Sequence, residues 1–379
     1  MSQFESEEMP PLSEQTRRPL DTALRQQRVK AWYPVLDPWY VIFGFLAIGA
    51  IFIPTGIQMQ NMSNKIFERI VEYDAFDNPH PLCGINKTAN SGRKCTISIE
   101  VDEDLKPPIL VYYQIENFHQ NHRKYARSRD LYQLYGYTTQ SPIQAELCEP
   151  LNFLGDIRLN PCGLIANTFF NDNIKLEAGI TSEGGVDLVM LEEGIAWQSD
   201  LDYMYRHPEG FRYEECPGAC DSSCCEGDDW SCTVPTVYKD DKCYRYFYPD
   251  DNKTQYLHET YPDMISPIDG VRDEHFIVWM RVAVLSKFRK LYGWINQPVV
   301  NGTILTFEIT NNWEVQSFKG KKSLVISTTN IFGGKNQWMG FYFYVVGFIC
   351  VGIAIFFALK QTIRPRRLAD KRYLYYKQD

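Results

Sequence analysis

The sequence lacks the short motifs that mark the common hydrolytic and nucleotide-binding enzymes. It has no glycine-rich loop G-x-x-x-x-G-K-[ST] to cradle a phosphate, no zinc-peptidase motif H-E-x-x-H and no serine-hydrolase motif G-x-S-x-G. The many Asp and Glu residues include no pair whose spacing singles it out for acid–base chemistry. We therefore expect no catalytic residue, cofactor or metal ion in this chain.

A surplus of positive charge is missing as well. The chain carries a formal net charge of -8 at pH 7, whereas a nucleic-acid partner requires a basic face that releases counterions from phosphate. We therefore expect no nucleic-acid partner. Repeats and long low-complexity stretches are also absent, so most of the chain between its ends is expected to form one folded domain.

Charged residues are absent from two long apolar runs, residues 39–57 and 340–359. About 20 helical residues cross a hydrocarbon core of about 30 Å, so both runs are predicted to be transmembrane helices. The first begins only at residue 39 and has no small-residue cleavage site after it, which predicts an uncleaved signal anchor. Because neither run holds a charge, an ion path through this chain alone is not expected.

Basic residues flank the outer ends of both runs, and such flanks stay in the cytosol. We therefore predict cytosolic tails at residues 1–38 and 360–379, and an ectodomain at residues 58–339 on the exoplasmic or lumenal side. The basic residues of the outer flanks are Arg25, Arg28, Lys30, Lys360, Arg364, Arg366, Arg367, Lys371, Arg372 and Lys377.

Cysteine usage agrees with this topology, because ten of the eleven cysteines lie between the two runs. Such a distribution is typical of a domain that folds in an oxidising compartment. Cys350, within the second run, is expected to stay a reduced thiol. The ten cysteines expected in disulfides are Cys83, Cys95, Cys148, Cys162, Cys216, Cys220, Cys224, Cys225, Cys232 and Cys243.

Six of these cysteines fall in residues 216–243, a segment rich in Gly, Pro, Asp and Ser. A zinc site is the alternative interpretation, since C-x3-C pairs can chelate. The absence of histidine from the segment and the adjacent Cys224 and Cys225 favour disulfides instead. Sequence cannot choose among the 15 possible pairings of six cysteines, so we expect a disulfide-linked surface insertion of undetermined connectivity.

Three sequons in the ectodomain predict glycan acceptors at Asn86, Asn252 and Asn301. A fourth sequon, at Asn61, lies only a few residues beyond the first apolar run. We expect it to remain unmodified because it lies too close to the bilayer.

The ectodomain is predicted to be mainly antiparallel β-structure with short helices. Segments rich in Val, Ile, Thr and aromatic residues predict strands, and helical spacing of apolar residues predicts two helices. The expected strands are residues 107–116, 276–285, 302–310 and 323–329, and the expected helices are residues 120–135 and 286–296.

His119 and His122 form the one pair that resembles a metal site by spacing. Four basic residues follow closely, namely Arg123, Lys124, Arg127 and Arg129. Their charge opposes a bound cation, so a polar surface is the preferred interpretation.

Several long segments, in this order, resemble the cell division control protein 50 / ligand-effect modulator family. The segments are QQRVKAWYPVLDP (26–38), VYYQIENFHQNHRKYARSRD (111–130), PCGLIANTFFND (161–172), GIAWQSD (194–200), EHFIVWMRVAVLSKFRKLYGWIN (274–296) and GGKNQWMGFYFYVVG (333–347). Members of this family are non-catalytic beta subunits of type IV P-type ATPases, the pumps that flip phospholipids. The pump signature DKTGT is absent from this chain, which therefore is not itself the catalytic subunit.

The resemblance implies a heterodimer with a type IV P-type ATPase catalytic subunit, beside membrane phospholipids. It also implies a role in folding, exit from the endoplasmic reticulum and aminophospholipid transport by that pump. Residence in endoplasmic reticulum, Golgi or endosomal, and plasma membranes follows from the same resemblance.

The family pattern further implies disulfides Cys83–Cys95 and Cys148–Cys162. Animal members have two bridges before the VYY segment where this chain has cysteines for one, and the insertion at residues 216–243 departs from the common pattern. Two other classes remain as alternatives: a stand-alone adhesion or ligand-binding receptor, favoured by the insertion, and a membrane-tethered ectoenzyme, for which no acid–base set is found.

Overall fold

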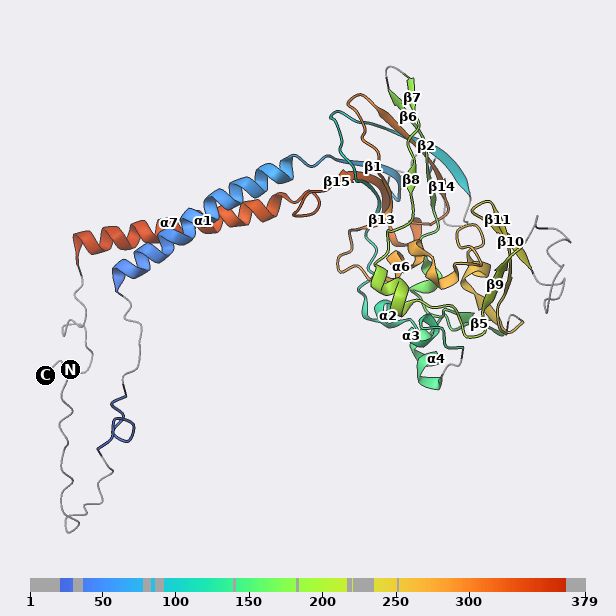
Figure 1. The fold of residues 1–379 in the computed structure, drawn as a ribbon, viewed down its shortest axis with the longest axis horizontal. Coiled ribbons are helices and arrows are strands. Elements are labelled where there is room, and N and C mark those ends of the chain that lie inside the picture. Colours follow the sequence, from blue (N-terminus) through green and yellow to red (C-terminus); the bar gives the residue numbers. More distant parts are fainter. Residues whose placement is uncertain are drawn as a thin grey trace, which may run out of the picture. The chain divides into compact units, whose positions relative to one another are not determined.

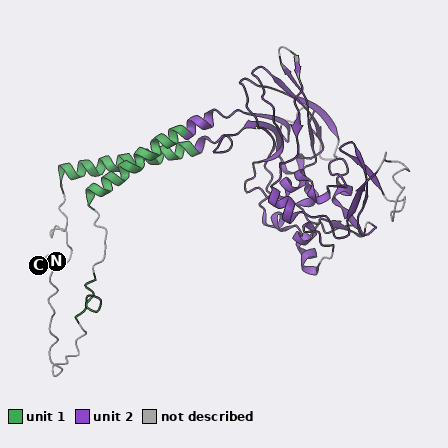
Figure 2. Cartoon of the chain, viewed as in Figure 1, with its two compact units in different colours: residues 1–58, 339–379 green, residues 59–338 purple. Residues whose placement is uncertain are grey.

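The computed structural model describes residues 21–29, 37–77, 83–85, 92–138, 141–181, 184–216, 220, 235–250 and 252–365. The chain divides into two compact units (Figure 2). Unit 1 comprises residues 1–58 and 339–379, and unit 2 comprises residues 59–338.

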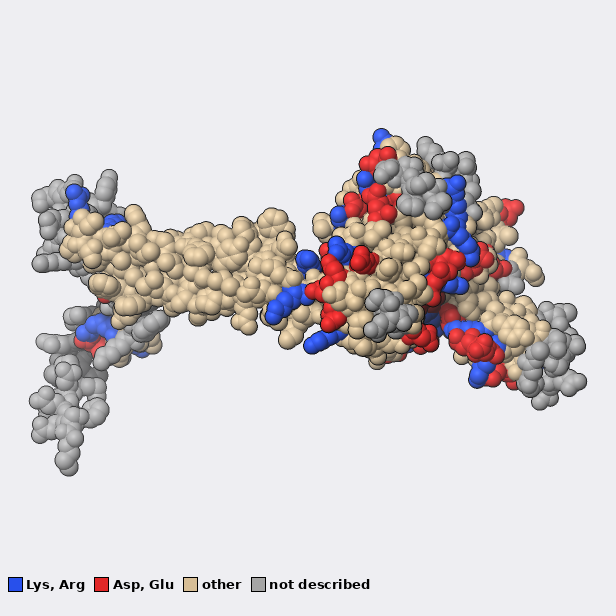
Figure 3. Space-filling model, turned by 90° about the horizontal axis from the view of Figure 1, so that it is seen from above, with Lys and Arg blue, Asp and Glu red and all other residues tan. Residues whose placement is uncertain are grey.

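Unit 1 is built on two long apolar helices, α1 (Pro38–Asn64) and α7 (Gln337–Ile363), of 27 residues each. Both are long and apolar enough to cross a membrane. The face of this helix pair seen in Figure 3 is almost free of charged side chains. The helices touch through Phe52 and Phe343, whose ring centroids are 5.3 Å apart, and glycines lie at their closest approach.

Unit 2 is mainly antiparallel β-structure, as predicted, and contains short helices (Figure 1). Its largest sheet has the order β1-β15-β3-β13-β8, and the four-stranded sheet has the order β2-β14-β6-β7. The strands of the first are β1 (Glu68–Ala75), β15 (Lys321–Thr328), β3 (Ile109–Glu116), β13 (Phe288–Ile295) and β8 (Met190–Leu191). Those of the second are β2 (Arg93–Glu100), β14 (Ile304–Asn311), β6 (Asn173–Thr181) and β7 (Gly184–Val186).

Two three-stranded sheets complete the described β-structure. One has the order β10-β11-β9, and the other, β12-β5-β4, contains the parallel pair β12 and β5. Their strands are β9 (Arg212–Glu215), β10 (Thr236–Lys239), β11 (Lys242–Phe247), β4 (Phe153–Leu154), β5 (Ile157–Asn160) and β12 (Thr254–Tyr256). The short helices are α2 (Arg123–Arg127), α3 (Leu131–Leu134), α4 (Pro142–Cys148), η2 (Ala166–Thr168), η3 (Asp200–Met204), α5 (Leu257–Thr260), η5 (Gly270–Arg272), α6 (Glu274–Met280) and η6 (Gln316–Phe318).

Three of the four predicted strands match β3, β14 and β15, but the strand predicted at residues 276–285 is wrong. Its first half is helix α6, in which Phe276, Ile277, Trp279 and Met280 are all buried. A short apolar run buried on several sides has no helical period to detect, and the β-branched and aromatic content imitates a strand.

The helix predicted at residues 286–296 is also wrong, because this segment forms strand β13. Phe288, Lys290 and Tyr292 point inward at alternate positions, and a register shift after Leu291 breaks the alternation. Because a lysine occupies one inward position and a β-bulge interrupts the strand, the sequence does not show the alternation of apolar and polar residues that is typical of a strand. The helix predicted at residues 120–135 is confirmed only in part, because α2 and α3 are separate short helices.

The core of unit 2 encloses a charged group, Lys322 of β15, whose side chain is 0% exposed. Its Nζ lies 2.7 Å from Asp172 Oδ2 and 3.8 Å from Asp74 Oδ2, and it also donates to Asn311 Oδ1 and the carbonyl of Trp313. Asp172 in turn accepts hydrogen bonds from the Tyr73 hydroxyl and from the backbone amides of Asn312 and Trp313. The network joins segments far apart in sequence, and burial raises the pKa of the Asp74 carboxyl.

Candidate functional site

Trp197 is an indole held out on the surface of unit 2. It is 66% exposed, and the guanidinium of Arg281 lies over its ring, with Cζ 4.8 Å from the ring centroid. Arg281 also forms an ion pair with Asp200, with nitrogen and oxygen 2.7 Å apart. This cation–π contact and ion pair fix the orientation of an aromatic side chain that contributes little to the core.

The loop that carries Arg281 also holds two exposed aliphatic side chains. Val284 is 76% exposed and Leu285 is 70% exposed. The loop backbone is fixed from the neighbouring segment, because Gln120 Oε1 accepts from the Ala283 amide at 2.9 Å and Asn121 Nδ2 donates to the Val284 carbonyl at 2.6 Å. Exposed apolar groups on a fixed backbone are available for contact with a partner. We call Trp197, Arg281, Val284 and Leu285 the Trp197 surface.

Helix α6, which leads into this loop, is capped at both ends by side chains. At its start the Asp273 carboxylate accepts from the Phe276 amide at 2.9 Å. At its end Lys290 Nζ donates to the carbonyls of Val278, Trp279 and Arg281 at 2.8, 2.9 and 2.5 Å. Burial lowers the pKa of Lys290 to about 7. Lys290 therefore positions the Arg281 backbone, which carries the Trp197 surface.

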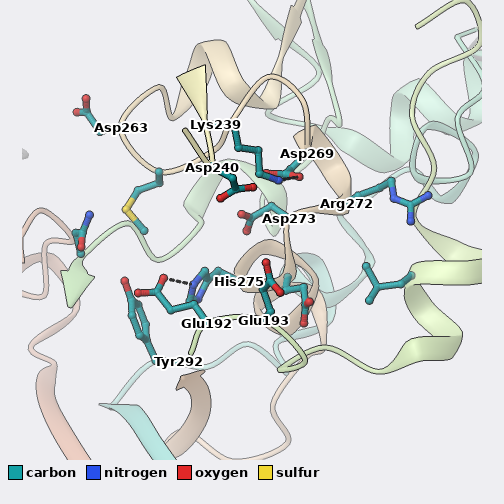
Figure 4. A pocket seen from close by; sticks show the side chains of 14 residues that line it. Glu192, Glu193, Lys239, Asp240, Asp263, Asp269, Arg272, Asp273, His275 and Tyr292 are labelled. Carbon is teal, nitrogen blue, oxygen red and sulfur yellow. Dashed lines mark hydrogen bonds and ion pairs between the residues drawn. The ribbon is translucent and has the colours of Figure 1, made fainter. Parts of the chain in front are cut away.

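A cavity of about 500 Å³ is lined in part by the first residues of α6 (Figure 4). Carboxylates dominate its lining, and they come from the loop after β8, the β10–β11 turn and the segment that leads into α6. The charged lining residues are Glu192, Glu193, Lys239, Asp240, Asp263, Asp269, Arg272, Asp273, Glu274 and His275. Within the part of the chain that the structure describes, no group of three or more His, Cys, Asp or Glu residues is arranged to hold a metal ion.

Two titratable groups of the cavity have raised pKa values. Burial raises the pKa of Asp273 to about 6. Burial by itself lowers the pKa of His275, but the hydrogen bond between its Nε2 and Glu192 Oε2, at 3.0 Å, and the surrounding carboxylates raise it overall. The lining of the cavity is thus mainly acidic. An ion pair between Lys239 of β10 and Asp269, 2.5 Å apart, connects strand β10 to this lining.

The disulfides implied by the family resemblance are the pairs found in the structure. Cys83 is bonded to Cys95, and Cys148 is bonded to Cys162. In the insertion, Cys220 is bonded to Cys243, and Cys216 is disulfide-bonded as well, so these three are not zinc ligands. Cys224, Cys225 and Cys232 lie outside the described residues, and Cys350 is a buried free thiol.

Two of the sequence-predicted glycan acceptors lie on the described surface of unit 2. Asn252, between β11 and β12, and Asn301, before β14, are both exposed. Asn61 is exposed too, but it belongs to helix α1. Asn86 lies outside the described residues.

A buried histidine packs against the end of strand β11. His258 of α5 is only 8% exposed and packs against Tyr248, with ring centroids 4.6 Å apart, while Tyr248 extends from the end of β11. Its Nδ1 has no hydrogen-bond partner among the residues that the structure describes. Burial lowers the pKa of His258 to about 4, well below its usual 6.5.

The segment from β11 to β12 is therefore expected to loosen in acid. Between pH 6.5 and 4 the unfolded chain binds a proton at position 258 that the folded chain does not, so the stability contributed by neutral His258 is complete above pH 6.5 and falls as the pH falls. At pH 5.5 the loss is about 1 kcal/mol. Hydrogen exchange of residues 242–256, corrected for intrinsic rates, should be faster at pH 5.5 than at pH 7.4.

A His258→Phe variant should reduce this pH dependence, because a phenyl ring fills the aromatic site without titrating. The remainder is expected from His207, whose pKa burial also lowers to about 4 and whose ring stacks on Phe211 beside Tyr248. His122→Phe is the matched control, since His122 is exposed and should leave the dependence unchanged. Equal pH dependence in all three proteins would contradict the assignment to His258.

Comparison with known proteins places these features in a family. Residues 59–367 match the family model described as LEM3 (ligand-effect modulator 3) family / CDC50 family. ALA-interacting subunit 3 of Arabidopsis thaliana is 33% identical over 95% of this chain and 90% of its own length. Cell cycle control protein 50A of Mus musculus is 33% identical over 88% and 86%, and the phospholipid-transporting ATPase accessory subunit CRF1 of Saccharomyces cerevisiae is 28% identical over 96% and 90%.

The protein is thus a membrane protein with two apolar helices and a large antiparallel β-domain. It belongs to the LEM3/CDC50 family.

Some residues of the site were not singled out from sequence. The pairing of Trp197 with Arg281 joins two of the segments that carry the family resemblance, but nothing in either segment indicates which side chains meet. Lys290 had one signal available: Phe288 and Tyr292 occupy the alternate positions on either side of it, where inward residues of a strand are expected.

Proposed function

We propose that this chain is the non-catalytic accessory subunit of a phospholipid-transporting P-type ATPase. The observation that carries the proposal is the extent of the family match: it covers unit 2 and α7, and the relatives named as ATPase accessory subunits align over most of their own length. The two apolar helices and the disulfide-bonded β-domain are consistent with a subunit that binds a membrane-embedded pump.

The chain forms a heterodimer with the catalytic subunit and supports its folding, exit from the endoplasmic reticulum and transport cycle. Both termini lie in the cytosol and unit 2 lies on the exoplasmic or lumenal side, in endoplasmic reticulum, Golgi or endosomal, and plasma membranes. The positive flanks Arg25, Arg28 and Lys360 support this orientation.

The Trp197 surface is the part of unit 2 best suited to contact the catalytic subunit. Interfaces concentrate their binding energy in Trp and Arg side chains surrounded by apolar neighbours. A subunit bound there shifts the transport cycle only by binding some states of the pump more tightly than others, with a coupling of about 1–3 kcal/mol.

Co-purification and reconstitution test this function. From mild detergent the tagged chain should recover a large multi-span ATPase in stoichiometric amount. Purified alone in liposomes, it should neither hydrolyse ATP nor move labelled phospholipid, while the heterodimer should do both. Trp197→Ala should reduce recovery of the ATPase, and Tyr213→Ala, a change at an exposed aromatic of strand β9 (52%), is the control. Transport by the isolated chain, or a pump with full expression and turnover without it, would refute the proposal.

Glycan mapping tests the orientation separately. We propose that Asn86, Asn252 and Asn301 carry glycans and that Asn61 does not, because Asn61 lies in α1 only a few residues beyond the apolar run, which keeps it near the bilayer. Single Asn→Gln variants at the three positions should each migrate faster, and endoglycosidase treatment should abolish the differences. A mobility shift for Asn61→Gln, or none for the other three, is the result that counts against this topology.

A further inference from the structure

A tight turn at the end of strand β15 displays two apolar side chains. Ile331 is 92% exposed and Phe332 is 52% exposed. The turn is closed by paired backbone hydrogen bonds between Asn330 and Gly333, at 3.0 and 2.9 Å, and by the Phe332 amide donating to Asn330 Oδ1 at 2.8 Å. Gly333 adopts a φ of 97°, a conformation that favours glycine. The exposed pair is therefore presented by a defined backbone.

The turn is attached to the end of helix α1. Asn330 Nδ2 donates to the Met62 carbonyl at 3.1 Å, and the Asn336 amide donates to Ser63 Oγ at 3.0 Å. The chain then enters α7 at Gln337. Along the chain the turn therefore lies between its contacts to the end of α1 and the start of α7.

Chain geometry places the turn near the membrane. The apolar run of α1 ends at Ile57, and at 1.5 Å per residue Met62 lies about 7 Å further along the helix. The headgroup region beyond the hydrocarbon core is about 5–8 Å thick on each side. Lys65 and Lys335, which flank the turn, are exposed and can reach lipid phosphates. Apolar tips with basic neighbours are typical of segments that sit in this region.

We propose that the Asn330–Gly333 turn inserts Ile331 and Phe332 into the lipid headgroup region of the leaflet nearest unit 2. The occupant of this apolar tip is lipid. The turn is a third attachment of the chain to the bilayer, beside the two helices, and it limits the motion of unit 2 relative to the membrane surface.

Depth measurement tests the proposal in the full-length chain in phospholipid nanodiscs. An environment-sensitive NBD label is placed at Ile331→Cys in a Cys350→Ser background, with the disulfides kept intact. Its emission should shift to shorter wavelength and should be quenched by lipids spin-labelled in the headgroup or upper acyl chain. The control is Asp241→Cys in the β10–β11 turn, at the end of unit 2 away from β15 (Figure 1), which should emit as in water and stay unquenched.

The other outcomes overturn the proposal. Water-like, unquenched emission at position 331 means that the turn does not reach lipid. Shielding that appears only when the catalytic subunit is bound, without lipid quenching, means that a protein surface covers the turn. Should Ile331→Cys fail to fold, as judged by migration without reductant, Phe332→Cys reports on the same turn with the same expected shift.

Discussion

Replacing Lys322 by methionine is expected to lower the free energy of unfolding of unit 2 by about 3–5 kcal/mol, because it leaves two buried carboxylates without their cation. Asp172 lies 2.7 Å from the ammonium in a site where neither side chain is exposed. Asp74 would lose its cation as well, at 3.8 Å. Thermal unfolding of the full-length protein in detergent, followed by tryptophan fluorescence without reductant, should show a midpoint lower by about 10 °C.

The adjacent residue provides the control. Lys321 lies on the same strand, but its partners Glu72 and Asp77 are partly exposed, so Lys321→Met should cost at most about 1 kcal/mol. Adding Asp172→Asn to Lys322→Met should recover part of the loss, because it removes one unpaired charge while keeping an acceptor oxygen. If Lys321→Met and Lys322→Met have equal effects, the network does not stabilise the core as described.

This network also shows why the core was only partly predictable. The strand at residues 323–329 was predicted from its β-branched residues, and it is the greater part of β15. The sequence KKSLVIST gives no reason to prefer Lys322 over Lys321 as the buried lysine. That choice depends on Asp74, Asp172 and Asn311, which come from three other segments and meet only in the folded chain.

The disulfides, too, were predictable from the sequence only in part. Cys83–Cys95 and Cys148–Cys162 followed from the family resemblance, because matching cysteines occupy matching segments. The bond between Cys220 and Cys243 did not follow, since six cysteines close in sequence allow many pairings and the insertion departs from the family pattern. The Cys216 amide donates to the Cys243 carbonyl, yet Cys243 is bonded to Cys220, so even the pairing of β9 with β11 does not indicate the disulfide partner.

Local ambiguity explains the exchange of helix and strand at α6 and β13. Side-chain caps stabilise α6 as a helix. Asp273 accepts a hydrogen bond from a backbone amide at its start, and Lys290, which belongs to the following strand β13, donates to a backbone carbonyl at its end. A period-based prediction has no access to a cap that depends on tertiary structure. The two segments were therefore exchanged, although the architecture as a whole was predicted correctly.

Changing Gly56 to leucine is expected to separate the two apolar helices, whereas the same change at Gly44 should have no such effect. A Cβ at Gly56 would lie 2.7 Å from the backbone nitrogen of Tyr344 and 2.9 Å from the carbonyl oxygen of Gly340. These are backbone atoms, so no side-chain rotation relieves the clash, and α1 and α7 must move apart. Gly44 has no atom within 4 Å of its added Cβ.

The two variants add the same side chain to the same helix, so their difference isolates the helix contact. Helices in lipid associate through close packing of small residues rather than through exclusion of water, and overpacking typically costs about 1–3 kcal/mol. Because the rings of Phe52 and Phe343 meet at this contact, cysteines at these two positions, in a Cys350→Ser background, should cross-link on oxidation in membranes. Gly56→Leu should reduce the cross-linking yield strongly, and Gly44→Leu should preserve it. Equal yields would mean that the glycine contact does not hold the pair together. Loss of the pair should also reduce recovery of the catalytic subunit, because an accessory subunit whose helices have separated no longer presents one surface to its partner.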